Sequence, residues 1–270
     1  MSLTPLQRDV CRLLARERRA HGESYVAGGV ALSVALDTHR LSRDVDLFHD
    51  TVEAVARSWD RDRRALTDAG YAALPVRERP GYVEAVIARG DDRLAIEWTR
   101  DSAFRFFPLV EHEELGLTLH AFDLATNKVL ALVGRLEARD WVDVIACDER
   151  VQPLGYLAWA ACGKDPGFTP QSILEHARRS SRYSDEEISS LAFDGAPPDA
   201  GLLSRRWREA VEAARALVAR LPAAHAGEAV LTRDARLFTG DAAALDRALA
   251  GDDLMFHPGR IGGALPEVIG

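Results

Sequence analysis

The chain has 270 residues, of which 47% are hydrophobic and 28% are charged, an ordinary composition for a globular protein of one large domain or two small ones. Its apolar runs are too short to cross a bilayer, its first residues lack the order of a secretion signal, and its three cysteines have no metal-ligand spacing, so we expect a reduced, cytoplasmic protein without a membrane partner. The net charge of −8 argues against a simple nucleic-acid binder, but uneven charge can still leave a local basic groove.

Helices and strands alternate in the first part of the chain. Val10, Leu13 and Leu14 recur at helical spacing and predict an N-terminal helix that packs on the core. Asp50-Thr51 is a typical N-cap, and Gly70 ends the helix that it opens. The elements expected here are a helix at 5–20, a strand at 25–27, a helix at 29–36, a strand at 45–48 and a helix from 51 to about 69.

A pair of glycines, Gly28 and Gly29, opens the helix expected at 29–36. Glycine lets backbone N–H groups approach a triphosphate closely, and the helix N-terminus behind it adds partial positive charge. A tight turn without a ligand explains the same two residues.

Two carboxylates, Asp44 and Asp46, occupy alternate positions at the strand expected at 45–48. Side chains two apart on a strand lie on one face, so both can reach one divalent ion while Val45 and Leu47 point into the core. The alternative is a solvated strand end. Together with the glycine pair, the two carboxylates favour a metal-dependent nucleotidyltransferase.

A group of three strands is expected next, at 71–76, 82–88 and 93–98. The turn Gly90-Asp91-Asp92 joins the last two as a hairpin. Alternation along the last strand places Glu97 on the face opposite Leu94 and Ile96. Glu97 is then either part of an acidic site or a solvent-facing residue at the end of a hairpin, and in the second case Asp101 is the next candidate.

The segment from 123 to 150 predicts two further helices. Asp123 is the expected N-cap of the first helix, and Lys128 and Arg135, two turns apart, project along the same side of it. A lysine on a helix is usually solvated, but Lys128 lies in an otherwise apolar segment.

The second of these helices carries Asp140 and Asp143, one turn apart, directly after Arg139. On physical grounds alone, Asp140 can be a helix N-cap or a partner in a structural ion pair.

In their order along the chain, these motifs resemble the polymerase-β-like nucleotidyltransferase superfamily, and within it the AbiEii/AbiGii-type toxin nucleotidyltransferases of bacterial toxin–antitoxin systems. The resemblance covers roughly residues 20–150. It implies an α+β fold, a small mixed sheet flanked by helices, followed by a mostly helical C-terminal region. The segments that carry it are Gly28-Gly29, Ser42-Arg43-Asp44-Val45-Asp46, Asn127-Lys128 and Arg139-Asp140-Trp141-Val142-Asp143.

The resemblance also implies roles for individual residues. Asp44, Asp46 and Glu97 are expected to bind Mg²⁺ or Mn²⁺, with Glu97 in the place of a third carboxylate that is more often aspartate in the superfamily. Lys128 is expected to bind the triphosphate, and Asp140 to support catalysis or to orient Lys128. The residues expected to contact the nucleotide are Gly28, Gly29, Ser33, Ser42 and Lys128; for Ser42 the alternative is an ordinary loop hydroxyl.

Three regions are expected along the chain: a nucleotidyltransferase core at 1–122, a helical domain at 123–224 with the Lys128 and Asp140 motifs, and a small appended segment at 225–270. Breakers such as Gly, Pro and Asp separate the later helices, and residues 195–199 mark a boundary among them. These helices are expected at 153–161, 170–179, 185–191 and 202–221.

The sequence therefore favours a toxin that transfers nucleotides from an NTP to RNA, in particular to the 3′ end of tRNA, with a cognate antitoxin protein encoded nearby. Two alternatives stay open: a nucleotidyltransferase that modifies a small molecule such as an antibiotic or a protein by AMP transfer, and a non-catalytic nucleotide-binding member. Lys128 and Asp140 favour the toxin, whereas the net acidity favours an acceptor other than RNA. For an RNA acceptor, the expected basic groove contains Arg40, Arg43, Arg135 and Arg139.

Overall fold

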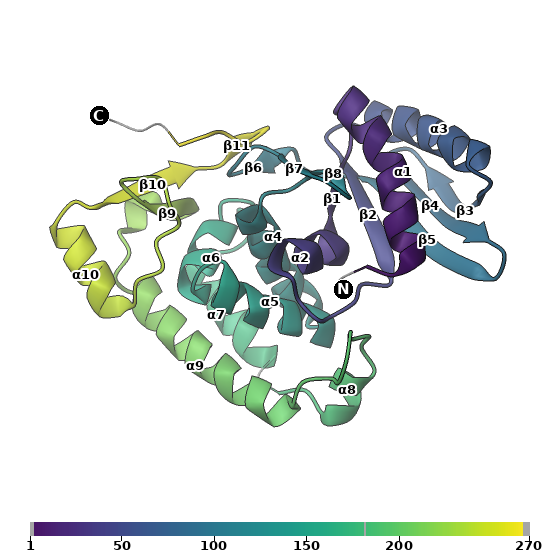
Figure 1. Cartoon of the computed structure of the whole chain (residues 1–270). Helices are drawn as coiled ribbons and strands as arrows, with labels where there is room; N and C mark the ends of the chain where they lie inside the picture. Colours follow the sequence, from purple (N-terminus) through teal and green to yellow (C-terminus); the bar gives the residue numbers. More distant parts are fainter. Residues whose placement is uncertain (1–2, 181, 267–270) are drawn as a thin grey trace. The chain divides into compact units, whose positions relative to one another are not determined.

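The computed structural model describes residues 3–180 and 182–266, and the chain divides into two compact units. Unit 1 consists of Met1–Ala103, Leu109–His120 and Ala192–Gly195, and unit 2 consists of Phe104–Pro108, Ala121–Leu191 and Ala196–Gly270. Figure 1 traces the elements of both units along the chain. The last four residues of the segment expected at 225–270 lie outside the described residues.

Unit 1 is built on a seven-stranded sheet of order β3-β4-β5-β2-β1-β8-β7. The pairs β2·β5 and β1·β8 are parallel and the other neighbours are antiparallel, so the sheet is mixed, as expected. All helices and strands predicted in this part of the chain are present, within a few residues of their expected ends. The elements are α1 (Pro5–His21), β1 (Tyr25–Ala27), α2 (Gly28–Leu36), β2 (Asp44–His49), α3 (Val52–Asp68), β3 (Ala72–Arg79), β4 (Tyr82–Arg89), β5 (Asp92–Arg100), β7 (Val110–His112) and β8 (Gly116–Thr118).

The helices α1 and α3 cover one face of this sheet (Figure 1). Along β2 and β5 the residues that face them are buried, and the intervening residues are only partly buried. Fully burying a side chain such as Leu47, Ile96 or Leu66 stabilises the fold by roughly 1.5–3 kcal/mol. The period-2 pattern therefore fixes which face of the sheet carries the polar residues of β2 and β5.

A distant segment of the chain completes unit 1. The amide of Leu41 donates to Ala192 O (2.9 Å), and the amide of Asp194 donates to His39 O (2.7 Å). These bonds hold the loop between α2 and β2 in place. Nothing in the local sequence of that loop predicts them.

Unit 2 is mostly helical, as expected for the region after the sheet. Its core includes the fully buried Trp141, Trp159 and Trp207. None of the helices in the described part of the chain is long and apolar enough to span a bilayer. The elements are β6 (Phe104–Arg105), α4 (Ala121–Arg135), α5 (Ala138–Arg150), α6 (Leu154–Ala161), α7 (Pro170–Ala177), η1 (Arg178–Ser180), α8 (Asp185–Ser189), α9 (Ala200–Val218), η2 (Ala223–His225), β9 (Glu228–Thr232), α10 (Ala242–Ala250), β10 (Leu254–Pro258) and β11 (Arg260–Ile261).

The prediction that Asp123 caps the helix after it is wrong, because α4 already begins at Ala121. The Asp123 carboxylate is fully buried and accepts hydrogen bonds from the amides of Phe106 (2.9 Å) and Phe107 (3.1 Å). It also pairs with Lys164 Nζ at 2.8 Å. Its role is therefore to tie the start of α4 to the segment that follows β6, a contact that a local capping rule cannot anticipate.

Candidate active site

Two of the three predicted metal ligands lie on one face of β2. Asp44 and Asp46 are partly buried, whereas Val45 and Leu47 between and beside them are buried in the core. In the parallel pairing of β2 with β5, Asp46 is the register partner of Glu97, and Asp44 is the partner of Ala95. All three predicted carboxylates therefore belong to the same face of the sheet, with Asp46 and Glu97 on adjacent strands about 5 Å apart.

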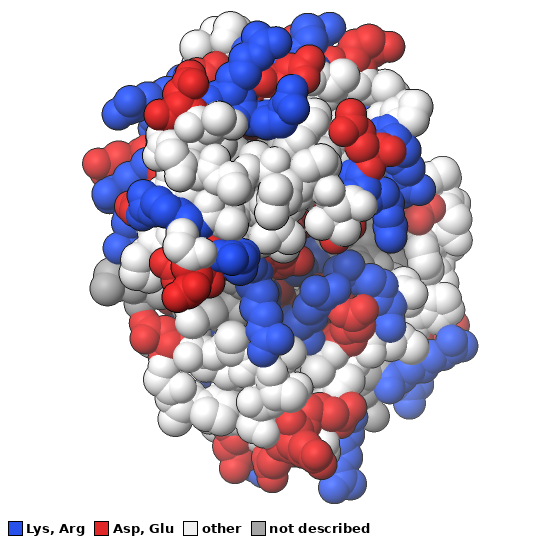
Figure 2. All heavy atoms as spheres, turned by 90° about the vertical axis from the view of Figure 1, so that its right-hand side faces the viewer, with Lys and Arg blue, Asp and Glu red and all other residues white. Residues whose placement is uncertain are grey.

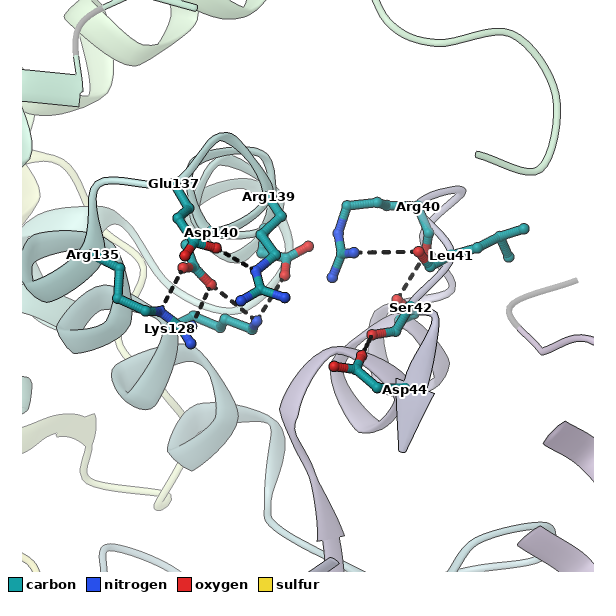
Figure 3. A network of polar contacts seen from close by, with 11 residues as sticks. Arg40, Leu41, Ser42, Asp44, Lys128, Arg135, Glu137, Arg139 and Asp140 are labelled. Carbon is teal, nitrogen blue, oxygen red and sulfur yellow. Dashed lines mark hydrogen bonds and ion pairs between the residues drawn. The ribbon is translucent and has the colours of Figure 1, made fainter. Parts of the chain in front are cut away.

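Ser42 holds the first of these carboxylates. Its hydroxyl donates to Asp44 Oδ1 at 2.9 Å (Figure 3), and its own carbonyl accepts a hydrogen bond from Gln7 Nε2 at 2.7 Å. Ser42 and Gln7 are both buried. The serine that precedes the carboxylate pair thus orients Asp44, a role that neither the phosphate-binding prediction nor the alternative of an ordinary loop hydroxyl had included.

Gly28 makes room for the second carboxylate. It lies in the left-handed region with φ +65°, a conformation that costs other residues free energy. A Cβ at this position would lie 1.7 Å from Asp46 Oδ2, far inside any allowed contact. Only glycine can therefore occupy the first position of α2 while Asp46 keeps its place.

Gly29 makes similar room on the other side of the loop. A Cβ there would lie 2.4 Å from Ser42 Oγ and 2.9 Å from Arg40 Nη2. The side chain of Arg40 is buried, and its Nη1 donates to Leu41 O at 3.3 Å (Figure 3). The glycine pair therefore brings the start of α2 against Ser42, Arg40 and Asp46 at once.

Ser33 lies deeper in α2 than the glycines. It is 1% exposed, and its hydroxyl donates to Arg40 O at 2.9 Å. This bond fixes the loop that carries Arg40 and Ser42. Whether Ser33 also meets a nucleotide stays a prediction.

Further polar residues extend the acidic face next to Glu97. Glu84 on β4 is the register partner of Glu97, and Tyr82 Oη donates to Glu84 Oε2 at 3.4 Å. Burial, followed by the negative charges of Glu97 and Glu84, raises the pKa of Tyr82. The sequence analysis missed Tyr82 and Glu84, although the same alternation that placed Glu97 also places them on this face.

Asp46, Glu97 and Glu84 form a row of carboxylates at directly opposite positions on adjacent strands. Like charges in such positions destabilise a sheet, so a bound cation would stabilise this row. Among residues 3–180 and 182–266, no group of three or more His, Cys, Asp or Glu side chains is already arranged to hold a metal ion. Mg²⁺ commonly takes one or two protein carboxylates and completes its shell with substrate phosphates and water. The carboxylate oxygens of Asp44 and Asp46 are the kind of donor that suits such an ion.

The strand that carries the carboxylates ends on a buried histidine. His49 has Nδ1 3.3 Å from Thr99 O, and its side chain is 0% exposed. Burial lowers the pKa of His49 to about 4. At neutral pH it is an uncharged part of the unit 1 core.

In unit 2, Lys128 is the centre of a network of ion pairs (Figure 3), in which Lys128 and both carboxylates are buried and Arg135 is exposed. Its Nζ lies 3.2 Å from Asp140 Oδ1 and 3.0 Å from Asp143 Oδ2. Arg135 binds Asp140 with two hydrogen bonds, Nε to Oδ2 at 3.1 Å and Nη2 to Oδ1 at 3.0 Å. The two positive charges of Lys128 and Arg135 balance the two negative charges of Asp140 and Asp143. The bidentate pairing of Arg135 with Asp140 also fixes the geometry of that carboxylate.

This network decides between the two physical alternatives for Asp140. Asp140 is an ion-pair partner, and the N-cap of α5 is Glu137, whose carboxylate lies 2.6 Å from Arg139 Nε. The two-turn spacing of Lys128 and Arg135 does bring both side chains to one carboxylate. Contact of Lys128 with a triphosphate stays a prediction.

Charge is mixed on the molecular surface. On the face that Figure 2 displays, Lys and Arg side chains are interspersed with Asp and Glu side chains. With a net charge of −8, attraction of RNA by the whole molecule is not expected, so any contact with phosphates has to come from a local group of cations.

Residues 12–114 match the family model described as Nucleotidyl transferase AbiEii toxin, Type IV TA system. The matched segment contains the glycine pair and the three carboxylates of unit 1. It ends before α4, so Lys128 and Asp140 lie outside it. The resemblance noted from the sequence is confirmed over the matched residues.

Two solved structures share the fold. JHP933 from Helicobacter pylori is 16% identical, with 82% of this chain and 95% of that chain covered and a TM-score of 0.51. MenT4, a nucleotidyltransferase toxin from Mycobacterium tuberculosis, is 15% identical, with 81% of this chain and 83% of that chain covered and a TM-score of 0.55. At these identities the likeness concerns the fold alone, and the expected α+β nucleotidyltransferase fold is confirmed. No functionally curated protein matches the chain at a significant level.

Proposed function

We propose that the protein is a nucleotidyltransferase toxin of a toxin–antitoxin system, and that it transfers nucleotides from an NTP to RNA, in particular to the 3′ end of tRNA. The observation that carries the proposal is the pair Asp44 and Asp46 on one face of β2, with Gly28 allowing the Asp46 carboxylate to approach the start of α2 closely, inside the segment that matches the AbiEii family model. The family match also supports a cognate antitoxin protein as partner.

In the proposed reaction, a hydroxyl of the acceptor attacks the α-phosphorus of the NTP, the bond to the β-phosphate breaks, and pyrophosphate leaves. Bound Mg²⁺ or Mn²⁺ would neutralise the charge that develops on the phosphates and make the attacking hydroxyl more acidic. Asp44 and Asp46 would hold the ions. Glu97, on the adjacent strand, is the candidate acceptor of the hydroxyl proton.

The chain's own residues prepare this geometry before any substrate binds. Ser42 fixes the rotation of the Asp44 carboxylate through the 2.9 Å hydrogen bond, and Gln7 in turn fixes Ser42. Such preorganisation supports catalysis because the carboxylates need not reorient when charge develops on the phosphates. On the resemblance, Lys128 is the proposed ligand of the triphosphate, and Asp140 orients it.

The net charge of −8 favours a small molecule or a protein over RNA as the acceptor, so the experiment has to identify which acceptor is labelled. The test is to incubate the protein with Mg²⁺ and each labelled nucleoside triphosphate in turn, together with purified tRNA, total protein or small metabolites. We expect label on tRNA, and no label with Asp44→Asn. Label on a protein or a metabolite but never on RNA would show that the acceptor is a protein or a small molecule and would refute the RNA acceptor. No label on any acceptor would refute the proposed transferase activity.

A further inference from the structure

An open pocket in unit 2 is lined by three arginines. It has a volume of about 700 Å³ and lies between the segment before α8 and the first turns of α9. Arg205 and Arg208 are one turn apart on α9 and therefore project along the same side of the helix, and Arg182 lines the pocket from the segment before α8. Asp185 is the acidic residue in the lining, so the pocket carries a net positive charge.

These guanidinium groups are not used elsewhere in the described part of the chain. All three residues are exposed, and no ion pair within 4 Å joins any of them to a carboxylate among residues 3–180 and 182–266. Arg205 lies along its own helix near Gly201, since a Cβ at Gly201 would meet Arg205 Nη1 at 3.7 Å. By contrast, Arg206 on the same helix pairs with Glu149 at 2.8 Å and does not line the pocket.

A buried hydroxyl without a partner also lines the pocket. Ser204 is 5% exposed, and its Oγ has no hydrogen-bond partner among the described residues. An unsatisfied buried polar group costs free energy, and a ligand oxygen would satisfy it. The N-terminus of α9 does not serve this purpose, because Asp199 already caps it.

Tyr183 in the pocket lining is held by two contacts. It donates its hydroxyl to Leu136 O at 2.6 Å, and its ring packs on Trp141 with centroids 5.0 Å apart. This part of the lining therefore has its own partners in the absence of a ligand.

We propose that this pocket binds phosphate groups of the RNA acceptor, with Arg205, Arg208 and Arg182 contacting phosphate oxygens and Ser204 donating to one of them. Arginine suits this task because its planar guanidinium binds phosphate oxygens with two hydrogen bonds. An open groove with guanidinium groups spaced along a helix suits an extended backbone better than a single small anion. The inference rests on the proposed function and names where its acceptor is held.

The test measures tRNA binding rather than transfer, in the full chain with the Asp44→Asn substitution so that the RNA stays unmodified. Affinity is measured at several salt concentrations for the parent protein and for Arg205→Ala/Arg208→Ala. Each phosphate contact contributes about 0.7–0.9 to the slope of log affinity against log salt. We therefore expect the slope to fall by about 1–2 and the affinity at low salt to fall by roughly tenfold or more.

A matched pair on the same helix removes the same charge outside the pocket. Arg206 and Arg215 pair with Glu149 and Glu212, so Arg206→Ala/Arg215→Ala should keep most of the affinity and the slope. Ser204→Ala should weaken binding modestly without lowering the melting temperature, since its hydroxyl makes no hydrogen bond within the described structure. Equal losses in the two arginine pairs, or parent-like binding by Arg205→Ala/Arg208→Ala, would overturn the proposal.

A second arm separates RNA from free nucleotide. If the pocket instead took the triphosphate, Arg205→Ala/Arg208→Ala would weaken binding of a nonhydrolysable NTP and leave tRNA binding unchanged, which overturns the assignment to RNA. Binding of tRNA that depends on the pocket, combined with no transfer of label to RNA, would refute the proposed function and leave the pocket assignment intact. The two failures are therefore distinguishable.

Discussion

Replacing Gly28 by alanine tests the geometry of the carboxylate site most directly. The added Cβ would lie 1.7 Å from Asp46 Oδ2, so the carboxylate has to move by about 1.5–2 Å to reach ordinary van der Waals contact. A misplacement of about 1 Å can lower the rate of an enzyme by roughly 100-fold. We expect Gly28→Ala to lose at least that factor in nucleotide transfer.

The same substitution also changes stability, and a control separates the two causes. Alanine at a positive φ costs about 1–2 kcal/mol, and crowding in a packed site adds about 1–3 kcal/mol. Gly22 has φ +66°, almost the value of Gly28, but nothing lies within 4 Å of a Cβ built there. Gly22→Ala therefore carries the backbone cost alone, which corresponds to a fall of roughly 2–8 °C in melting temperature, and it should keep its transfer activity.

The assays are thermal unfolding of both variants and transfer of label from an NTP to tRNA at a temperature where both are folded. Gly28→Ala should unfold at a lower temperature than Gly22→Ala and should be inactive. Equal melting temperatures and equal activity of the two variants would show that the close approach of Gly28 to Asp46 has no role in the site. The stability comparison stands even if the acceptor is not RNA.

Other substitutions test the remaining features. Asp44→Asn keeps the shape of the side chain and the hydrogen bond from Ser42 but removes a charged metal ligand. Transfer should therefore be abolished while the unfolding temperature stays unchanged. Activity with unaltered dependence on Mg²⁺ would contradict the assignment of Asp44 as a ligand. Lys128→Ala leaves the negative charge of the fully buried Asp140 less compensated. The free energy of unfolding should fall by about 3–5 kcal/mol, and Lys128→Arg should restore part of it. Calorimetry with a nonhydrolysable NTP then shows whether Lys128 also binds nucleotide, and equal affinity in folded Lys128→Ala would leave only the structural role. Because burial lowers the pKa of His49 from 6.5 to about 4, protons bind the unfolded chain more readily, so the stability that neutral His49 contributes is full above about pH 6.5 and is lost as the pH falls toward 4. His49→Gln should reduce this loss of melting temperature on acidification, and an unchanged pH profile would refute the assignment.

The sequence alone determined the elements of unit 1 from α1 to β5 and the face on which its carboxylates lie, whereas the short strands β7 and β8 were not predicted. The reason is local: the period of two along β2 and β5 fixes that Asp44, Asp46 and Glu97 oppose the buried Leu47 and Ile96 whatever the neighbouring strands are. The cap at Thr51 fixed the start of α3 in the same local way. The motif order was sufficient to identify the resemblance that the match at 12–114 confirms.

Tertiary structure decided which partner each polar group has. Asp123 looked like a helix cap but is buried against the amides of Phe106 and Phe107, and Asp140 was resolved as an ion-pair partner only by its contacts with Lys128 and Arg135. These partners are far from a local capping position, so no spacing rule can choose among them.

The need for glycine at position 28 also follows from tertiary structure. The sequence predicted a turn there, but the close approach to Asp46 arises because β1 and β2 pair with Ala27 opposite Asp46. Periodicity reports which side of an element is buried, because that depends on residues a few positions apart. Which atom lies next to a given residue depends on strand register and on segments that come from elsewhere in the chain. Residues 192–195, which bind the loop before β2, are such a segment. Only the folded chain specifies these contacts.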